Sequence, residues 1–231
     1  MLRMTSTLIL STGIALSGLF IGLGFLNAKH PLQYVEVKGL AEEIVKSDEG
    51  IWTLNIKLVN NDLNALYENI SKAQQATREF LIHQGFKEEE LSMNPVSVVD
   101  NQSVSYNTNQ EMPRYSADTG LTVSSHQVDQ IANAIQKTGD LVQQGVVVTS
   151  SNATYRFTQL NEIKPKMLEA ATQSARVAAE SFAKDSQTSL GGIHHASQGL
   201  FTITDANSSF DSGNSILKKV RIVTTVEYQL K

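Results

Sequence analysis

Residues 51–59 have the sequence IWTLNIKLV, in which apolar and polar side chains alternate. Its apolar positions are Trp52, Leu54, Ile56 and Leu58. In an extended chain, every second side chain points to the same side, so these four residues share one face. The stretch therefore predicts a β-strand with one buried face and one polar face.

The residues on either side of this strand extend the pattern. Residues 34–46 predict a preceding strand, and the polar run Ser47–Gly50 is typical of a hairpin turn between the two. After the strand, Asn60–Asp62 offers N-cap side chains for a helix. Apolar residues then recur at helical spacing from Leu63 to Leu81, which predicts an amphipathic helix that ends near Gln84–Gly85.

The remaining chain continues as strands and helices separated by polar segments. Alternation predicts strands over residues 91–99, 115–125, 146–157, 193–203 and 220–230, and helical spacing predicts helices over 128–135 and 164–187. Pro165 is expected in the first turn of the last helix, and Gly191–Gly192 is expected to stop that helix. Polar residues predict loops over 101–113 and 205–215. The predicted fold is α+β, with two α/β halves in which mainly antiparallel sheets are packed by helices.

The first part of the chain has a different composition. No charged residue occurs from Thr7 to Leu26, a run long enough to cross a bilayer as a helix. We therefore predict an N-terminal transmembrane helix or signal-anchor over residues 1–30 and an extracytoplasmic domain over 31–231. Gly18 and Gly22 form a Gly-x-x-x-Gly pair and are candidates for packing between membrane helices. Arg3 places the N-terminus in the cytoplasm, so the domain is expected in the periplasm or another extracytoplasmic space.

A cleaved signal peptide is the alternative interpretation of this segment. It would end near Leu26–Ala28 and leave a soluble periplasmic protein. Both interpretations export residues 31–231.

Composition excludes several classes of function. The 231 residues include no cysteine, which excludes a cysteine nucleophile, a thiolate metal site and a disulfide scaffold. With 19 basic and 23 acidic residues the formal net charge is −4, so we expect no nucleic-acid partner.

Four short motifs bear on catalysis or metal binding, and each has a structural explanation. His194 and His195 are adjacent on a predicted strand and point to opposite faces, so they do not form a shared metal site. We interpret Glu88–Glu90 as a solvated turn and Ser124–His126 as residues that cap a helix. Gly191–Gly192 follows a predicted helix and is interpreted as its end. We also interpret Lys218–Lys219 as charges that protect a strand edge. The sequence predicts no enzyme, with no catalytic, metal or cofactor-binding residue.

Several strings in order along the chain resemble the SIMPL-domain family, which includes bacterial periplasmic 26-kDa immunogenic and oxidative-stress-defence-like proteins. They are VEVKG at 35–39, RYSA at 114–117 with LTV at 121–123, the alanine-rich run from Ala171 to Ala183, LGGI at 190–193, and the strand 220–230. This resemblance implies an exported α/β module that self-associates and is linked loosely to envelope stress. It implies no catalytic residues.

Together these observations favour a membrane-anchored extracytoplasmic protein that assembles with itself into a homo-oligomeric, ring-like envelope scaffold. One alternative is an adaptor that binds another envelope protein through the loops 101–113 and 205–215. The other alternative is a hydrolase of envelope material.

Overall fold

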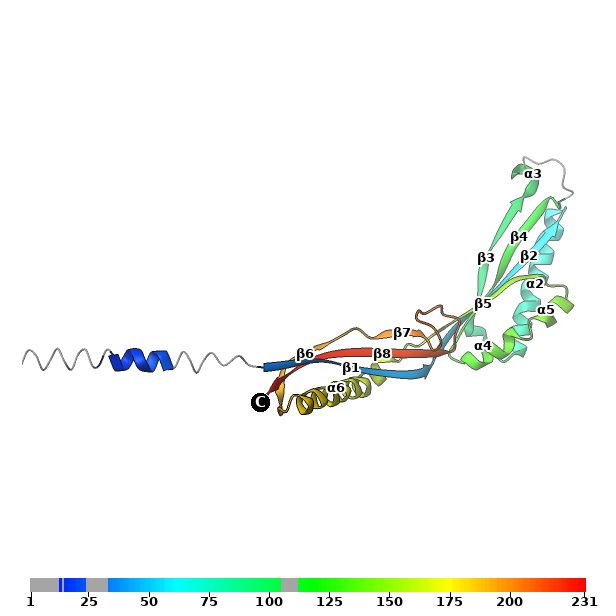
Figure 1. The fold of residues 1–231 in the computed structure, drawn as a ribbon. Helices are drawn as coiled ribbons and strands as arrows, with labels where there is room; N and C mark the ends of the chain where they lie inside the picture. The colour runs from blue at the N-terminus through cyan, green and yellow to red at the C-terminus, as the bar shows by residue number, and fades with distance from the viewer. Residues whose placement is uncertain (1–12, 14, 24–32, 105–111) are drawn as a thin grey trace, which may run out of the picture. The chain divides into compact units, whose positions relative to one another are not determined.

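The computed structural model describes residues 13, 15–23, 33–104 and 112–231. In chain order, its elements are β1 (Gln33–Lys46), β2 (Glu49–Asn60), α2 (Leu63–His83), η1 (Glu88–Glu90), β3 (Leu91–Asp100), α3 (Asn101–Val104), β4 (Tyr115–Ser125), α4 (Val128–Ile135), α5 (Gly139–Gln143), β5 (Val148–Arg156), α6 (Leu160–Asp185), β6 (Leu190–Gln198), β7 (Thr202–Asp205) and β8 (Leu217–Leu230) (Figure 1). This order confirms the predicted α+β class.

Two sheets are present in the described residues. One has the order β1-β8-β6, with β7 also paired to β8, and the other has the order β3-β4-β2-β5. Helices pack on both sheets, and the pairings of β2, β3 and β5 in the second sheet are antiparallel. The chain divides into two compact units, which we describe separately.

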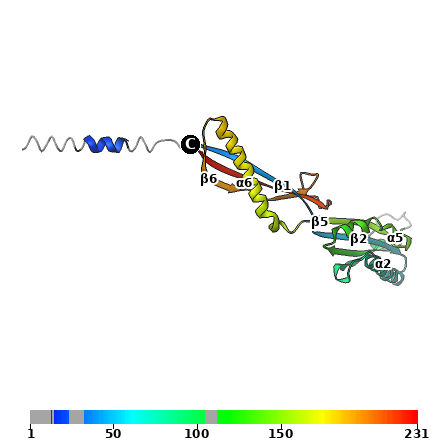
Figure 2. The ribbon, with the colours of Figure 1, turned by 90° about the horizontal axis from the view of Figure 1, so that it is seen from below.

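Unit 1 comprises the residues up to Gly39, Ala171–Gly199 and Thr224–Lys231. Here α6 lies against the strands (Figure 2). The contact is close because small residues meet there: a Cβ added to Gly39 would lie 1.9 Å from the carbonyl oxygen of Ala171. Ala171, Ala175, Ala179 and Ala183 line the buried stripe of the helix. These small side chains allow the close approach of the helix, whereas Phe182 on the same helix is exposed.

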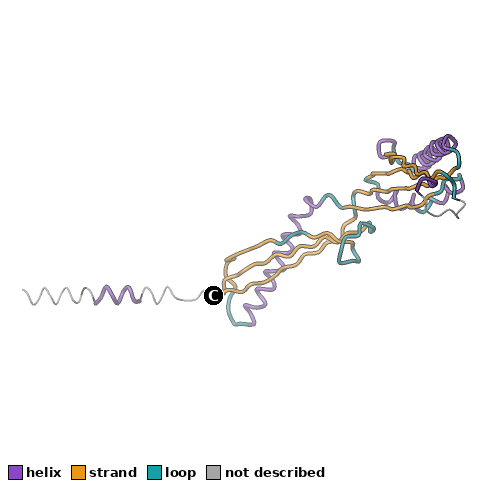
Figure 3. Tube along the Cα trace, turned by 90° about the horizontal axis from the view of Figure 1, so that it is seen from above, coloured by secondary structure: helices purple, strands orange, loops and turns teal. Residues whose placement is uncertain are grey.

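Unit 2 comprises Leu40–Ala170 and Leu200–Val223. Figure 3 draws its strands in orange and its helices in purple. Trp52, Leu54 and Ile56 are fully buried beneath α2 and α4, as the alternation predicted. The opposite face of the sheet is polar, and there Asn55 donates a hydrogen bond to Ser150 (2.8 Å). Helices α2 and α4 therefore cover one face of this sheet.

Helix α2 begins where the sequence predicted. Asp62 has an extended backbone, and its carboxylate accepts a hydrogen bond from the amide of Ala65 at 2.8 Å. This bond satisfies one of the amides that have no partner within a helix.

The predicted hairpin between the first two strands is wrong. β1 and β2 belong to different sheets, and the backbone amides between them bond to other segments: Ser47 donates to Ile216 (2.7 Å) and Asp48 to Arg156 (3.0 Å). Alternation identifies a strand but does not specify its partner. The polar run 47–50 therefore connects two sheets.

The predicted bounds of α6 also need correction. The helix begins at Leu160, so Pro165 lies inside it rather than in its first turn. It ends at Asp185, and Gly191 and Gly192 lie in β6 instead of stopping the helix. Gln187 takes the left-handed conformation at the helix end (φ 56°), and Thr188 donates to the carbonyl of Ala183 (2.9 Å). This is the geometry of a Schellman end, which glycine usually supplies.

Within the described residues, no helix is both long and apolar enough to cross a membrane. Of the span predicted over residues 7–26, residues 13 and 15–23 are described and helical. The rest of the span and the boundary at residue 30 lie outside the described residues.

Candidate functional site

A buried ion cluster joins β7, β8 and the segment between them. The side chain of Lys218 is fully buried, and its Nζ lies 2.6 Å from Oδ1 of Asp205 and 2.7 Å from Oδ1 of Asp211. Asp205 also accepts hydrogen bonds from the amide of Ser212 (3.0 Å) and from its hydroxyl. The sequence interpretation of Lys218 as an exposed edge charge is therefore wrong.

The charges in this cluster stabilise one another. Hydrogen bonds from Lys218 and Ser212 hold the pKa of Asp205 well below its ordinary value, although burial acts in the opposite direction. Burial acts to lower the pKa of Lys218, but its hydrogen bonds with Asp205 and Asp211 outweigh that effect and raise it. Both partners therefore stay charged at neutral pH. A protonated ammonium is not a nucleophile, so this arrangement does not activate Lys218 for covalent chemistry.

The ion cluster fixes the segment 205–215, which the sequence predicted as a polar loop. Gly213 accepts a hydrogen bond from the amide of Tyr155 at 2.6 Å, and so this segment covers part of the free edge of β5. Ile216 accepts from Ser47 (2.7 Å). The burial of Lys218 was missed because its two acidic partners lie 13 and 7 positions away in a stretch that looked like a solvated loop.

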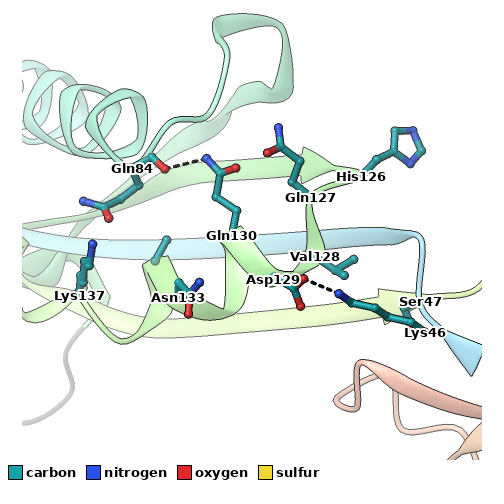
Figure 4. Close-up of a pocket in the computed structure, with 11 residues that line it drawn as sticks. Lys46, Ser47, Gln84, His126, Gln127, Val128, Asp129, Gln130, Asn133 and Lys137 are labelled. Atoms are coloured by element: carbon teal, nitrogen blue, oxygen red, sulfur yellow. Dashed lines mark hydrogen bonds and ion pairs between the residues drawn. The ribbon is translucent and has the colours of Figure 1, made fainter.

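A pocket of about 600 Å³ lies beside α4, and its lining is mainly polar (Figure 4). It is lined by Lys46, Ser47, Gln84, His126, Gln127, Val128, Asp129, Gln130, Asn133, Ala134 and Lys137. These residues come from the end of β1, the end of α2, the helix α4 and the turn that follows it. No sequence motif predicts this pocket, because its polar residues come from separate segments that meet only in the fold.

Some of the lining groups already have partners. Gln130 donates to the carbonyl oxygen of Gln84 at 2.7 Å, and Lys46 pairs with Asp129. His126 directs Nδ1 to the carbonyl oxygen of Asp48, at 2.8 Å. Figure 4 shows Lys137, Asn133 and Gln84 on one side of Gln130, and the Lys46–Asp129 ion pair on the other.

A third feature is an exposed apolar edge. β3 is an edge strand and pairs only with β4 among the described strands. Met93 and Val98 lie opposite Leu121 and Ala117, which are buried on the helix-covered face, yet Met93 and Val98 are 57% and 46% exposed. Residues directly opposite each other on neighbouring strands lie on the same face of the sheet. Met93 and Val98 are therefore on the face that α2 packs against, but at its edge, where α2 does not bury them.

The exposed face of α2 continues this edge. Gln74 donates to Thr119 of β4 (2.9 Å), and Arg78 pairs with Glu88, just before β3 (2.8 Å). Tyr67 lies two helical turns before Gln74, so it is on the same side of α2, and it is 72% exposed. We call Tyr67, Met93 and Val98 the β3 patch.

The two adjacent histidines considered as metal ligands, His194 and His195, lie on β6. The ring of His194 stacks on Tyr34 with centroids 4.3 Å apart, and His195 lies opposite Glu227 in the sheet. His83 contacts the carbonyl oxygen of Glu79 (2.9 Å). Within the described part of the chain, no group of three or more histidine or carboxylate side chains is placed to hold a metal ion.

The other sequence candidates are explained by local structure. Glu88–Glu90 forms a short 3₁₀ turn. The predicted capping of α4 by the serines is wrong, because Gln127 is the N-cap residue and makes no side-chain capping bond. Ser125 instead accepts a hydrogen bond from the amide of Gln127 (3.1 Å), just before the helix. Nothing lies within 4 Å of a Cβ built on Gly18 or Gly22, and their role in membrane-helix packing stays a prediction.

A comparison with curated proteins gives no match for this chain. A family model described as "SIMPL: Protein of unknown function (DUF541)" matches residues 35–219, which include most of both sheets and all the helices from α2 to α6. The chain therefore belongs to the SIMPL family.

Proposed function

We propose that this protein is a membrane-anchored extracytoplasmic scaffold that works by assembling with copies of itself, without catalysis. The uncharged segment over residues 7–26 supports the anchor. Membership of the SIMPL family supports a domain outside the cytoplasm. The observation that carries the assembly is the β3 patch, because exposed apolar groups at an open sheet edge favour contact with another chain.

The composition of β3 supports a second copy as the partner. Leu91–Val99 contains no charged residue, so two copies of this strand meet without repulsion. Pro95 lacks an amide hydrogen, and the register with β4 shifts between Asn94 and Ser97, so continuous pairing along the whole strand is interrupted. We therefore propose a contact in which side chains of the β3 patch pack against the same patch of the partner, with only short backbone pairing.

This contact relates two copies by a twofold axis, because each contributes the same surface. The other edge of the sheet is a weaker candidate, since residue Gly213 already bonds to Tyr155 on β5. Assembly into a ring therefore requires a second surface, in addition to the β3 patch.

Light scattering on the full chain in detergent, beside a chain that starts at Pro31, tests the proposal. We expect a discrete assembly in both, and a smaller species when Met93→Lys and Val98→Lys are combined. Val142→Lys is the matched control, because Val142 is also exposed (61%) but lies on α5, away from the β3 patch. A monomer at every concentration tested, or equal effects of the patch and control variants, would contradict the assembly.

An adaptor that binds another envelope protein is the second candidate function. Asp205–Ser215 is a weaker binding loop than the sequence suggested, because Lys218 and Tyr155 hold it in place. Residues 101–104 form the short helix α3, and residues 105–111 lie outside the described chain. Deleting residues 105–111 tests the adaptor role: it predicts loss of a co-purifying envelope protein, whereas unchanged partners would contradict it.

A further inference from the structure

The pocket beside α4 contains polar groups that the fold itself does not use. Among the described residues, the side chains of Gln84, Gln127, Asn133 and Lys137 make no hydrogen bond or ion pair within the chain, although all four line the pocket. A carboxamide offers both donors and an acceptor, and an ammonium offers three donors. These groups are available to a ligand.

One further group in the lining is buried without a partner. Ser47 is 3% exposed, and its hydroxyl oxygen has no hydrogen-bond partner. Its backbone amide bonds to Ile216, so the residue is held in position while its hydroxyl is left unsatisfied. A buried hydroxyl without a partner is unfavourable, and each such group in a native fold calls for an explanation. A polar ligand in the pocket would supply the missing partner of Ser47.

The charges of the pocket favour an anion. The lining contains two lysines and one carboxylate, and the carboxylate of Asp129 is paired with Lys46. Lys137 is therefore the one lining lysine without an acidic partner in the described chain. The pocket also contains only two apolar residues, Val128 and Ala134, so an apolar ligand would find little surface to contact.

We propose that this pocket binds a small acidic saccharide. Sugar hydroxyls donate and accept hydrogen bonds, as the carboxamides of Gln84, Gln127 and Asn133 do, and a sugar carboxylate pairs with Lys137. A volume of about 600 Å³ accommodates one or two sugar rings. A peptide fits less well, because the lining offers no apolar pocket for a side chain. This binding site is independent of the β3 patch, because the two share no residue.

Isothermal titration calorimetry on the full chain in detergent tests the proposal, with α-1,4-digalacturonate as the probe and neutral α-1,4-galactobiose as its counterpart. We expect digalacturonate to bind and galactobiose to bind at least about tenfold more weakly, because it lacks the charge-assisted contact. Lys137→Met is expected to weaken digalacturonate binding about tenfold, and Lys137→Arg to retain most of it.

Lys184→Met is the matched control, since it removes a positive charge near the end of α6 and outside the pocket. Thermal unfolding of each variant verifies that the fold is retained. The proposal is overturned if digalacturonate does not bind, if it binds no better than galactobiose, or if Lys137→Met and Lys184→Met act equally. Light scattering on the same samples reports assembly separately, so failure here is distinguishable from failure of the scaffold.

Discussion

Removing the charge of Lys218 should destabilise unit 2 strongly. Its ammonium is fully buried between Asp205 and Asp211, and Asp205 is itself only 6% exposed. We predict that Lys218→Met lowers the free energy of unfolding by about 3–5 kcal/mol, because it leaves a buried carboxylate without its counterion. Urea unfolding measures this. Combining Lys218→Met with Asp205→Asn should recover part of the loss, and no recovery would show that charge pairing is not the cause.

The same ion cluster predicts how stability changes in acid. The pKa of Asp205 is lower in the folded chain than in the unfolded chain, so its contribution is present above the unfolded value of about 4 and is lost as pH falls toward the lower folded value. Between pH 5 and pH 2.5, the free energy of unfolding measured in urea should fall more for the native chain than for Asp205→Asn. An equal fall in the two chains would contradict a contribution of Asp205 to this pH dependence.

Gln187 offers a gain in stability at a single position. Its φ of 56° is strained for a residue with a Cβ, and glycine adopts it freely. We expect Gln187→Gly to raise the free energy of unfolding by up to about 1 kcal/mol. Gln187→Ala keeps a Cβ and should give no gain, so equal midpoints of urea unfolding for the two variants would show that the backbone is not strained there.

At the scale of elements, the packing of α6 on β1 depends on the absence of one side chain. A Cβ on Gly39 would approach the carbonyl oxygen of Ala171 to 1.9 Å, which the helix can relieve only by moving away. We predict that Gly39→Ala destabilises the fold by about 1–3 kcal/mol in urea unfolding. Gly192 in β6 is the control, because nothing lies within 4 Å of a Cβ there, and Gly192→Ala should change stability by less than about 0.5 kcal/mol.

The elements differ in how far local sequence determines them. The buried face of β2 and the start of α2 at Asp62 were predicted, because a period of two and a capping side chain act within a few residues. The separation of β1 and β2 into different sheets was not predicted, because strand pairing depends on residues such as Ile216 that lie far along the chain. The pocket beside α4 was missed for the same reason: its polar groups come from four segments and carry no motif.

At the scale of the whole molecule, the proposed scaffold depends on an anchor in residues 1–30. The uncharged run from Thr7 to Leu26 is long enough to hold the chain in a bilayer, whereas a signal peptide would be removed and leave the domain free. We predict that the full chain stays with membranes after washing at high pH, and that its N-terminal sequence begins at or near Met1. Combining Leu16→Arg with Phe20→Arg should shift the protein to the soluble fraction, because two charges at the centre of a membrane helix are strongly unfavourable. Val142→Lys adds a charge at an exposed position outside this segment and is the control. A mature chain that begins after residue 26 would contradict the anchor, and assembly would then depend on the domain alone.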